Sequence, residues 1–220
     1  MLSLRERVID KYKKCLVTHG TQCLEMAHVV PRHICHHLGM TNLSHDINNC
    51  LLLHAGCHAS FDRFCWTFDV YSAKPSRKPN YVYINTIASP TKHDVSLRMH
   101  ISEIEIPLSL MPMLWVHYQV FLAIMFSHHR SICGFFRHCL QSDTLQYINT
   151  YGWWVHKEHI NRVPACHLIH GQRTNGKYHV LMHGQAFDQS VWLDARDIPK
   201  DLITVYEDYK EHIEDPDYVP

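Results

Sequence analysis

The chain has 220 residues, of which 46% are hydrophobic and 19% are charged, a composition that excludes a disordered protein. Lysine plus arginine and aspartate plus glutamate both number 21, so the chain has no overall positive charge that would attract nucleic acid. Any binding to nucleic acid must therefore come from local basic patches.

The first predicted elements are a helix, short strands and a second helix. Apolar residues at four-residue spacing among charges predict an amphipathic helix over residues 2–14. After it, the sequence predicts strands at residues 15–18 and 23–30 and an aperiodic loop at 31–46. A third strand at 50–53 and a helix at 55–65 follow.

The middle of the chain predicts a basic linker at residues 72–80, strands at 81–88 and 96–106, and helices at 111–127 and 131–142. The uncharged run over residues 106–127 has the length of a membrane span. Pro112 and His117 interrupt it and no one-sided Lys/Arg cluster flanks it, so a buried helix is predicted and no membrane partner. Residues 1–145 thus predict one α+β domain with a core at residues 15–70.

Composition changes near residue 151, and a small separate module is predicted over residues 151–213, followed by a tail at 214–220. The Asn175-Gly176 pair between alternating apolar segments is a strong hairpin signal. Residues 201–212 predict a terminal helix. The overall prediction is an α+β protein with two parts.

Histidine and cysteine are the notable side chains. Histidine occurs 21 times, so a lone histidine pair is poor evidence of a metal site. The nine cysteines form no Cys-x-x-Cys pair and no secretory signal is present, which predicts reduced thiols in an intracellular protein that is not secreted. The alternative of a structural zinc site rests on four cysteines whose spacing fits no zinc template: Cys15, Cys23, Cys35 and Cys57.

Residues 23–69 carry the pattern that bears on function. His28 ends one apolar strand, Asn49 opens the next, and His58 and Asp62 lie four residues apart on a predicted helix. Phosphodiester hydrolysis needs a base that activates water and positive charge beside the leaving oxygen. A histidine held on a strand suits the base, and a His–Asp pair on one helix face can chelate an ion. The Asn49 amide can hold neighbouring backbone or the catalytic ring. The pattern predicts a nuclease.

This segment resembles an HNH endonuclease of the variety in which the first strand reads Ala-His-Ile/Val-x-Pro and the helix reads His-x-x-Phe-Asp. It resembles in particular the HNH-domain proteins abundant in fungal genomes, including a later Ser-Leu-Arg-x-His strand at residues 96–100. The resemblance implies a ββα-metal core with added helices, one divalent ion (Mg, Mn or Zn) as cofactor, and DNA as the partner.

The resemblance also implies roles by position. His28 would be the general base and Asn49 the motif asparagine, with Asn48 as a one-residue alternative. His58 would be a metal ligand, and Asp62 a second ligand or the residue that orients it. Plausible phosphate contacts, each with solvated surface charge as the alternative, are Arg32, Arg63 and Lys74.

One departure from the family pattern concerns the metal. Many HNH nucleases have Asp or His immediately before the base, and here that residue is Ala27. Glu25 lies two residues earlier on the same strand face and would substitute, or water, Asp46 or His54 would complete the site. The rival interpretation is therefore a catalytically degenerate HNH scaffold that binds nucleic acid, chromatin or a protein.

The C-terminal region resembles a chromodomain, in which a curved three-stranded sheet is closed by a helix. The resemblance rests on Gly176-Lys177-Tyr178-His179-Val180, Ser190-Val191-Trp192 and Leu202-Ile203-x-x-Tyr206. The aromatic cage that captures methyl-lysine is not matched, because Met182 and Gln185 stand where aromatics are expected. Trp153 or Trp154 would supply one wall, and Trp192 is predicted in the core. The resemblance implies a targeting or adaptor module in a nuclear protein.

Overall fold

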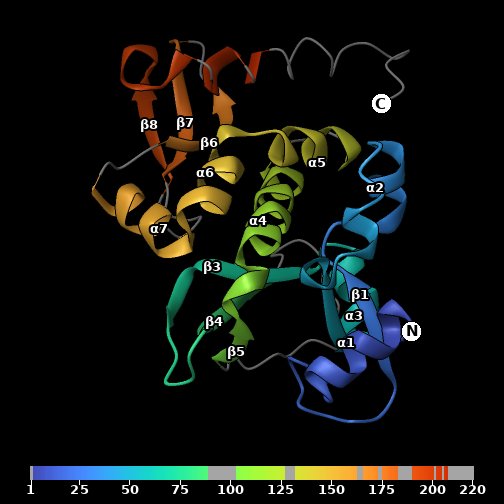
Figure 1. Ribbon diagram of the computed structural model, residues 1–220. Coiled ribbons are helices and arrows are strands. Elements are labelled where there is room, and N and C mark those ends of the chain that lie inside the picture. The colour runs from blue at the N-terminus through green and yellow to red at the C-terminus, as the bar shows by residue number, and fades with distance from the viewer. Residues whose placement is uncertain are drawn as a thin grey trace.

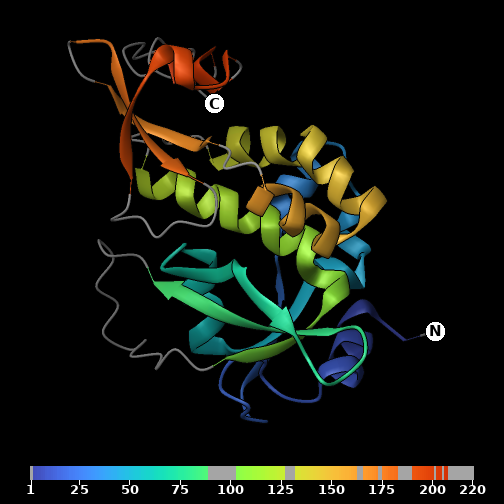
Figure 2. The same ribbon diagram turned by 90° about the vertical axis from the view of Figure 1, so that its left-hand side faces the viewer.

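The computed structural model describes residues 2–88, 103–126, 132–162, 166–172, 175–182, 190–200, 202–204 and 206–207. Within these ranges the chain forms a strand hairpin, two three-stranded sheets and a set of helices (Figure 1). The helices from the middle of the chain lie between the larger sheet and the small C-terminal sheet, as the rotated view also shows (Figure 2). The fold is mixed α+β.

The N-terminal helix α1 (Leu4–Tyr12) begins at a capping box. The Ser3 hydroxyl accepts a hydrogen bond from the Glu6 N–H at 3.2 Å, and the Glu6 carboxylate accepts one from the Ser3 N–H at 2.7 Å. These bonds satisfy two N–H groups at the start of the helix. The amphipathic helix predicted over residues 2–14 is confirmed.

A strand hairpin followed directly by a helix comes next. Strand β1 (Leu24–His28) pairs antiparallel with strand β2 (Cys50–His54), and helix α3 (Ala55–Asp62) follows β2 without a loop. The His54 Nδ1 atom accepts a hydrogen bond from a backbone N–H in the first turn of α3 at 3.2 Å. The predictions of two strands and a helix are confirmed for residues 23–30, 50–53 and 55–65, with ends shifted by a few residues.

Two predictions for this part of the chain are wrong. The strand predicted at residues 15–18 is a turn, although the Leu16 N–H bonds to a β2 carbonyl at 2.9 Å. The loop predicted over residues 31–46 contains helix α2 (Arg32–His37) and the 3₁₀ turn η1 (Leu43–His45). Both are too short for a hydrophobic period to develop along them, so the sequence pattern does not reveal them.

The larger sheet has the order β3–β4–β5, with strands Trp66–Pro75, Tyr81–Ala88 and Ile104–Pro107. The linker predicted over residues 72–80 is wrong in its first part, because β3 continues to Pro75 beyond a bulge after Asp69. The strand predicted at 81–88 is confirmed. The strand predicted at 96–106 is observed from Ile104 onward, and residues 96–100 lie outside the described residues.

The helical layer contains α4, α5, α6 and α7, with bounds Met111–Phe126, Ile132–Leu140, Asp143–Tyr151 and Trp153–Arg162. The helices predicted at 111–127 and 131–142 are confirmed, whereas α6 and α7 were not predicted. In the described part of the chain no helix is both long and apolar enough to cross a membrane.

Helix α4 carries a buried histidine that connects it to α3. The His117 side chain is 1% exposed, and its ring stacks on Phe61 with 3.9 Å between centroids and on Phe64 with 4.8 Å. Its Nδ1 atom lies 2.8 Å from the Thr67 hydroxyl. Burial lowers the pKa of His117 to about 3, so the ring is neutral at pH 7. The hairpin, α3 and α4 therefore share one core.

The C-terminal sheet has the order β6–β7–β8, with strands Cys166–Gln172, Lys177–Met182 and Val191–Asp194. It has a small core of its own, made by Ile169, Tyr178, Val180 and Ile198. Residues 202–204 and 206–207 are helical, and the rest of the predicted terminal helix lies outside the described residues, as does the tail at 214–220. The chromodomain-like identity of this sheet stays a prediction.

Three tryptophans lie elsewhere than predicted. Trp153 is 3% exposed and belongs to the large core, and Trp154 packs against that core, so neither forms a cage wall beside the small sheet. The predicted start at residue 151 therefore falls among the helices, before the sheet. Trp192 is half-buried and stacks on His179 at 4.4 Å. Because His179 points away from the core residues that flank it on β7, Trp192 lies on the opposite face of the sheet.

The neutral state of His117 predicts a pH-dependent stability. The unfolded chain protonates this ring below about pH 6.5, whereas the folded chain does so only near pH 3. The free energy of unfolding should therefore fall with decreasing pH between these values, by up to about 1.4 kcal/mol per pH unit from this ring. His117→Phe keeps a stacked ring and removes the titration. Urea unfolding from pH 6.5 to 4.5 should give a shallower pH dependence in this variant, and equal slopes would contradict the prediction.

Candidate active site

The side chain of Asn49 joins the segments that surround the predicted site. It is fully buried at the end of the 3₁₀ turn η2 (Ile47–Asn49), just before β2. Its Oδ1 atom accepts a hydrogen bond from the Val30 N–H at 2.8 Å, and its Nδ2 atom donates to the Val30 carbonyl at 3.1 Å. Nδ2 also donates to the Leu43 carbonyl at 3.2 Å. One amide thus ties the end of β1 and the turn η1 to the start of β2.

The bond to Leu43 fixes the backbone that contacts His28. The His28 Nε2 atom lies 3.1 Å from the carbonyl oxygen of Ser44, the neighbour of Leu43 in η1. A carbonyl only accepts hydrogen bonds, so Nε2 carries the proton and Nδ1 of the neutral ring has the free lone pair. Burial lowers the pKa of His28, the Ser44 contact opposes this, and the charge of Arg32 lowers it further. The ring is therefore neutral near pH 7, as a base requires.

His58 has the opposite electrostatic environment. Its Nε2 atom lies 3.2 Å from an Asp62 carboxylate oxygen, one helical turn later on α3, and its Nδ1 atom lies 2.8 Å from a Glu25 carboxylate oxygen on β1. The contact with Asp62 is the largest cause that raises the pKa of His58, burial opposes it, and Glu25 raises it as well. With a carboxylate at each ring nitrogen, the imidazole donates from both and favours its cationic form.

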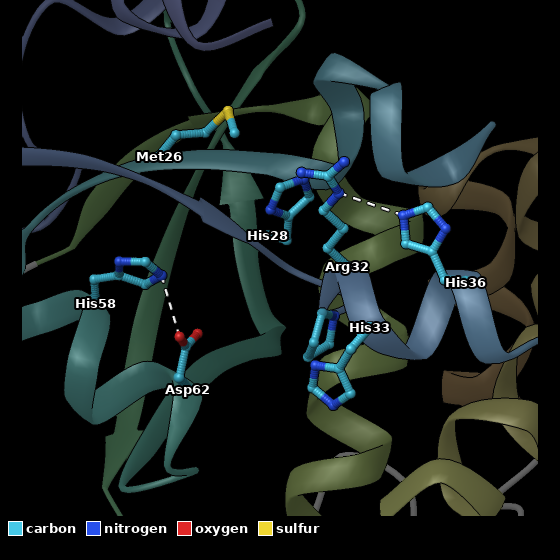
Figure 3. A pocket seen from close by; sticks show the side chains of 8 residues that line it. Met26, His28, Arg32, His33, His36, His58 and Asp62 are labelled. Carbon is cyan, nitrogen blue, oxygen red and sulfur yellow. Dashed lines mark hydrogen bonds and ion pairs between the residues drawn. The ribbon is translucent and has the colours of Figure 1, made fainter. Parts of the chain in front are cut away.

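The two histidines face one cleft (Figure 3). The cleft has a volume of about 570 Å³. Helix α3 supplies one wall with His58 and Asp62, strand β1 contributes Met26 and His28, and the close view shows Asp62 pointing toward His58. Helix α2 supplies the other wall. The lining residues are Met26, His28, Pro31, Arg32, His33, His36, His58 and Asp62. The fold therefore brings together three of the residues singled out by the sequence pattern: His28, His58 and Asp62.

The donor set of the cleft fits a divalent cation with two protein ligands. Two adjacent ligands of an octahedral ion, each about 2.1 Å from it, lie about 3.0 Å apart. The 3.2 Å between His58 Nε2 and Asp62 Oδ2 is close to this spacing. His58 would have to release its Nε2 proton to become a ligand. No group of three or more His, Cys, Asp or Glu side chains arranged to hold a metal occurs among the described residues, so further ligands would be water or phosphate oxygens.

The predicted additional ligands differ in their positions. Glu25 reaches His58, but at the ring nitrogen remote from Asp62, so it orients the imidazole and does not complete a shared site. Ala27 is fully buried and faces the core. Asp46 caps the turn η2 and His54 caps α3, and neither lines the cleft. The alternative structural zinc site has no support in the described part of the chain.

The predicted phosphate contacts also differ in whether they line the cleft. Arg32 lines the cleft, whereas Arg63 and Lys74 do not. The Lys74 ammonium pairs with the Glu103 carboxylate at 3.0 Å on the larger sheet. The sequence pattern did not single out His33 and His36, which also line the cleft. Their signal was the cluster of a basic residue and histidines after Pro31, which the abundance of histidine in this chain obscures.

One known family matches the part of the chain that forms this cleft. Residues 15–69, about a quarter of the chain, match the model of a family described as HNH endonuclease. The matched segment contains the hairpin, α3 and every predicted residue of the base and the metal pair. The match supports a place for this segment in the HNH family and suggests nuclease activity, nucleic acid as substrate and the divalent metal ion that such enzymes generally use. No curated protein and no solved structure matches the chain.

The bonding of Asn49 predicts a large effect of one substitution. Asn49→Asp keeps the shape but removes both Nδ2 donors and places a carboxylate against the Val30 and Leu43 carbonyls. We expect a loss of about 3 kcal/mol in the free energy of unfolding, measured in urea. Asn48→Asp at the adjacent, half-buried position is the matched control and should change it by less than about 0.5 kcal/mol. Equal effects of the two substitutions would contradict the assignment of Asn49, and not Asn48, as the motif asparagine.

The His58–Asp62 pair predicts a metal-binding phenotype that does not depend on activity. Asp62→Asn removes the anionic oxygen next to His58 Nε2 and should weaken Mn²⁺ binding by more than about tenfold in titration calorimetry. Asp10→Asn removes an exposed carboxylate on α1 and should leave the affinity unchanged. If both variants bind Mn²⁺ like the wild type, the pair is not a metal site.

Proposed function

We propose that the protein is a metal-dependent endonuclease that hydrolyses phosphodiester bonds in DNA. The observation that carries the proposal is the difference between two histidines in one cleft. His28 is neutral with a defined tautomer, and His58 is paired with Asp62 at the spacing of two metal ligands. The family match over residues 15–69 supports the same function.

In the proposed mechanism His28 is the general base. Its Nδ1 atom takes a proton from water, the resulting hydroxide attacks phosphorus, and the bond to the leaving 3′ oxygen breaks. The Ser44 carbonyl holds the Nε2 proton, so the ring can act only through Nδ1 and becomes the imidazolium with its orientation unchanged. A divalent ion at His58 and Asp62 would supply positive charge beside the scissile phosphate and the leaving oxygen. Asn49 acts indirectly, through the backbone that orients His28.

A catalytically degenerate scaffold is the second candidate, and one specific observation favours it. Ala27 brings no ligand at the strand position that many HNH nucleases use for the metal, and its side chain is fully buried. The protein would then bind DNA, chromatin or another protein in the cleft without cleaving it. The C-terminal sheet, with a separate core, would serve either version as a targeting module in the nucleus.

The base assignment predicts a loss of cleavage in one variant. His28→Ala should reduce the rate of plasmid nicking with Mg²⁺, Mn²⁺ or Zn²⁺ by roughly 10²- to 10⁴-fold, the usual contribution of a general base. His45→Ala, an exposed histidine that does not line the cleft, is the control and should nick at the wild-type rate. Activity that survives His28→Ala contradicts the mechanism, and no nicking by the wild type with any of these ions favours the scaffold.

A further inference from the structure

Helix α2 presents a paired arginine and histidine to the cleft. The Arg32 Nε–H donates a hydrogen bond to the His36 Nε2 atom at 3.3 Å, one helical turn later. Both side chains line the cleft, and the close view shows the bond between them with the arginine reaching back toward His28 (Figure 3). The arginine lies close enough for its charge to lower the pKa of His28. The close view shows this guanidinium beside the imidazole of the base (Figure 3).

The position of α2 is determined by its buried side. Ile34 is 4% exposed and Cys35 is fully buried, so these residues pack into the large core. The Asn49 amide also lies 3.9 Å from the Cys35 sulfur, which ties α2 to the same asparagine that orients His28. With its inner side held this way, α2 turns Arg32, His33 and His36 outward to the cleft.

The charges that line the cleft indicate which side chain would pair with an anionic phosphate. A phosphodiester is anionic, and the opposite wall carries the Asp62 carboxylate. Of the lining residues in the described part of the chain, only Arg32 has a permanent positive charge, and its hydrogen bond to His36 uses Nε. The two terminal amino groups of the guanidinium are thus the donors suited to phosphate oxygens.

We propose that Arg32 clamps the scissile phosphate on the side of the base, and that His36 is the positioning residue that holds its guanidinium in place. This inference rests on the proposed nuclease function and adds the residues that recognise the phosphate. The His36 imidazole accepts a hydrogen bond from Arg32 Nε, which orients the planar guanidinium so that its two terminal amino groups face the cleft. The phosphate would lie between this guanidinium and the His58–Asp62 pair on the opposite wall.

The first test measures binding without catalysis. A fluorescein-labelled DNA duplex is titrated with protein in EDTA at several salt concentrations, and log K is plotted against log salt. Loss of one phosphate contact in Arg32→Ala should reduce the steepness by about 0.9. Arg77→Ala removes an exposed arginine that does not line the cleft and should keep the wild-type slope, as should His36→Ala, in which the charge of Arg32 remains.

The second test measures kcat/KM on the same duplex with the metal that supports nicking. Arg32→Ala should lose roughly 10- to 100-fold and His36→Ala roughly three- to tenfold, the range of a charged and of a neutral hydrogen bond. His36→Gln restores an acceptor and should recover most of the loss. His37→Ala, the exposed neighbour outside the cleft, should match the wild type. In the Arg32→Ala background, His36→Ala should have no further effect, because it acts through the arginine.

Each outcome decides the proposal separately from the nuclease function. A wild type that nicks DNA while Arg32→Ala behaves like Arg77→Ala overturns the clamp and leaves the nuclease standing. A His36→Ala loss that persists without Arg32 overturns the positioning role. A wild type that binds with the Arg32-dependent slope but never nicks supports the clamp and removes the catalytic proposal. A wild type that neither binds nor nicks overturns both. Thermal melting of every variant identifies any that fails to fold.

Discussion

The hydrogen bonds of one buried amide determine the geometry of the cleft. Asn49 holds the strand end that follows His28 and, through Leu43, the turn whose next carbonyl contacts the imidazole. The same amide contacts the sulfur of Cys35 on α2, the helix that carries Arg32. The segment between the two strands has its own helix, turns and buried side chains, and the amide connects these to the strands. An asparagine fits this role because it supplies an acceptor and two donors in one rigid plane.

Within the cleft, two chemically identical side chains acquire different properties from their surroundings. His28 is partly desolvated and near an arginine, which favours the neutral ring, whereas His58 lies between two carboxylates, which favour the charged ring. Such divergence of pKa values between neighbouring groups is a common sign of a division of roles in an active site. It also explains why the abundance of histidine in the sequence is uninformative by itself, since the environment decides the role of each ring.

Much of the fold follows from local patterns in the sequence, and the failures have physical causes. The period of apolar residues locates α1, the long uncharged run locates α4, and the spacing of His58 and Asp62 places them on one helix face. In contrast, the contact of Glu25 with His58 depends on how α3 packs against β1, which no local pattern encodes. The proline and lysine residues near 72–80 suggested a linker, but edge residues of a bulged strand tolerate the same composition. Helix α2 is stabilised by burial of two residues and by Asn49, both tertiary effects.

The aromatic stack around His117 bears on how such a domain can be inherited. Phe61 and Phe64 lie inside the segment that matches the HNH family, but the ring that covers them comes from α4, far outside it. A gene fragment that encoded only the matched segment would lack this ring, so the faces of Phe61 and Phe64 that stack on it would be exposed to water, although Phe61 would keep its contacts with Trp66 and Phe68. The unit that can pass between proteins is therefore larger than the matched segment. A protein that received only this segment would have to supply another flat ring to stack on Phe61 and Phe64.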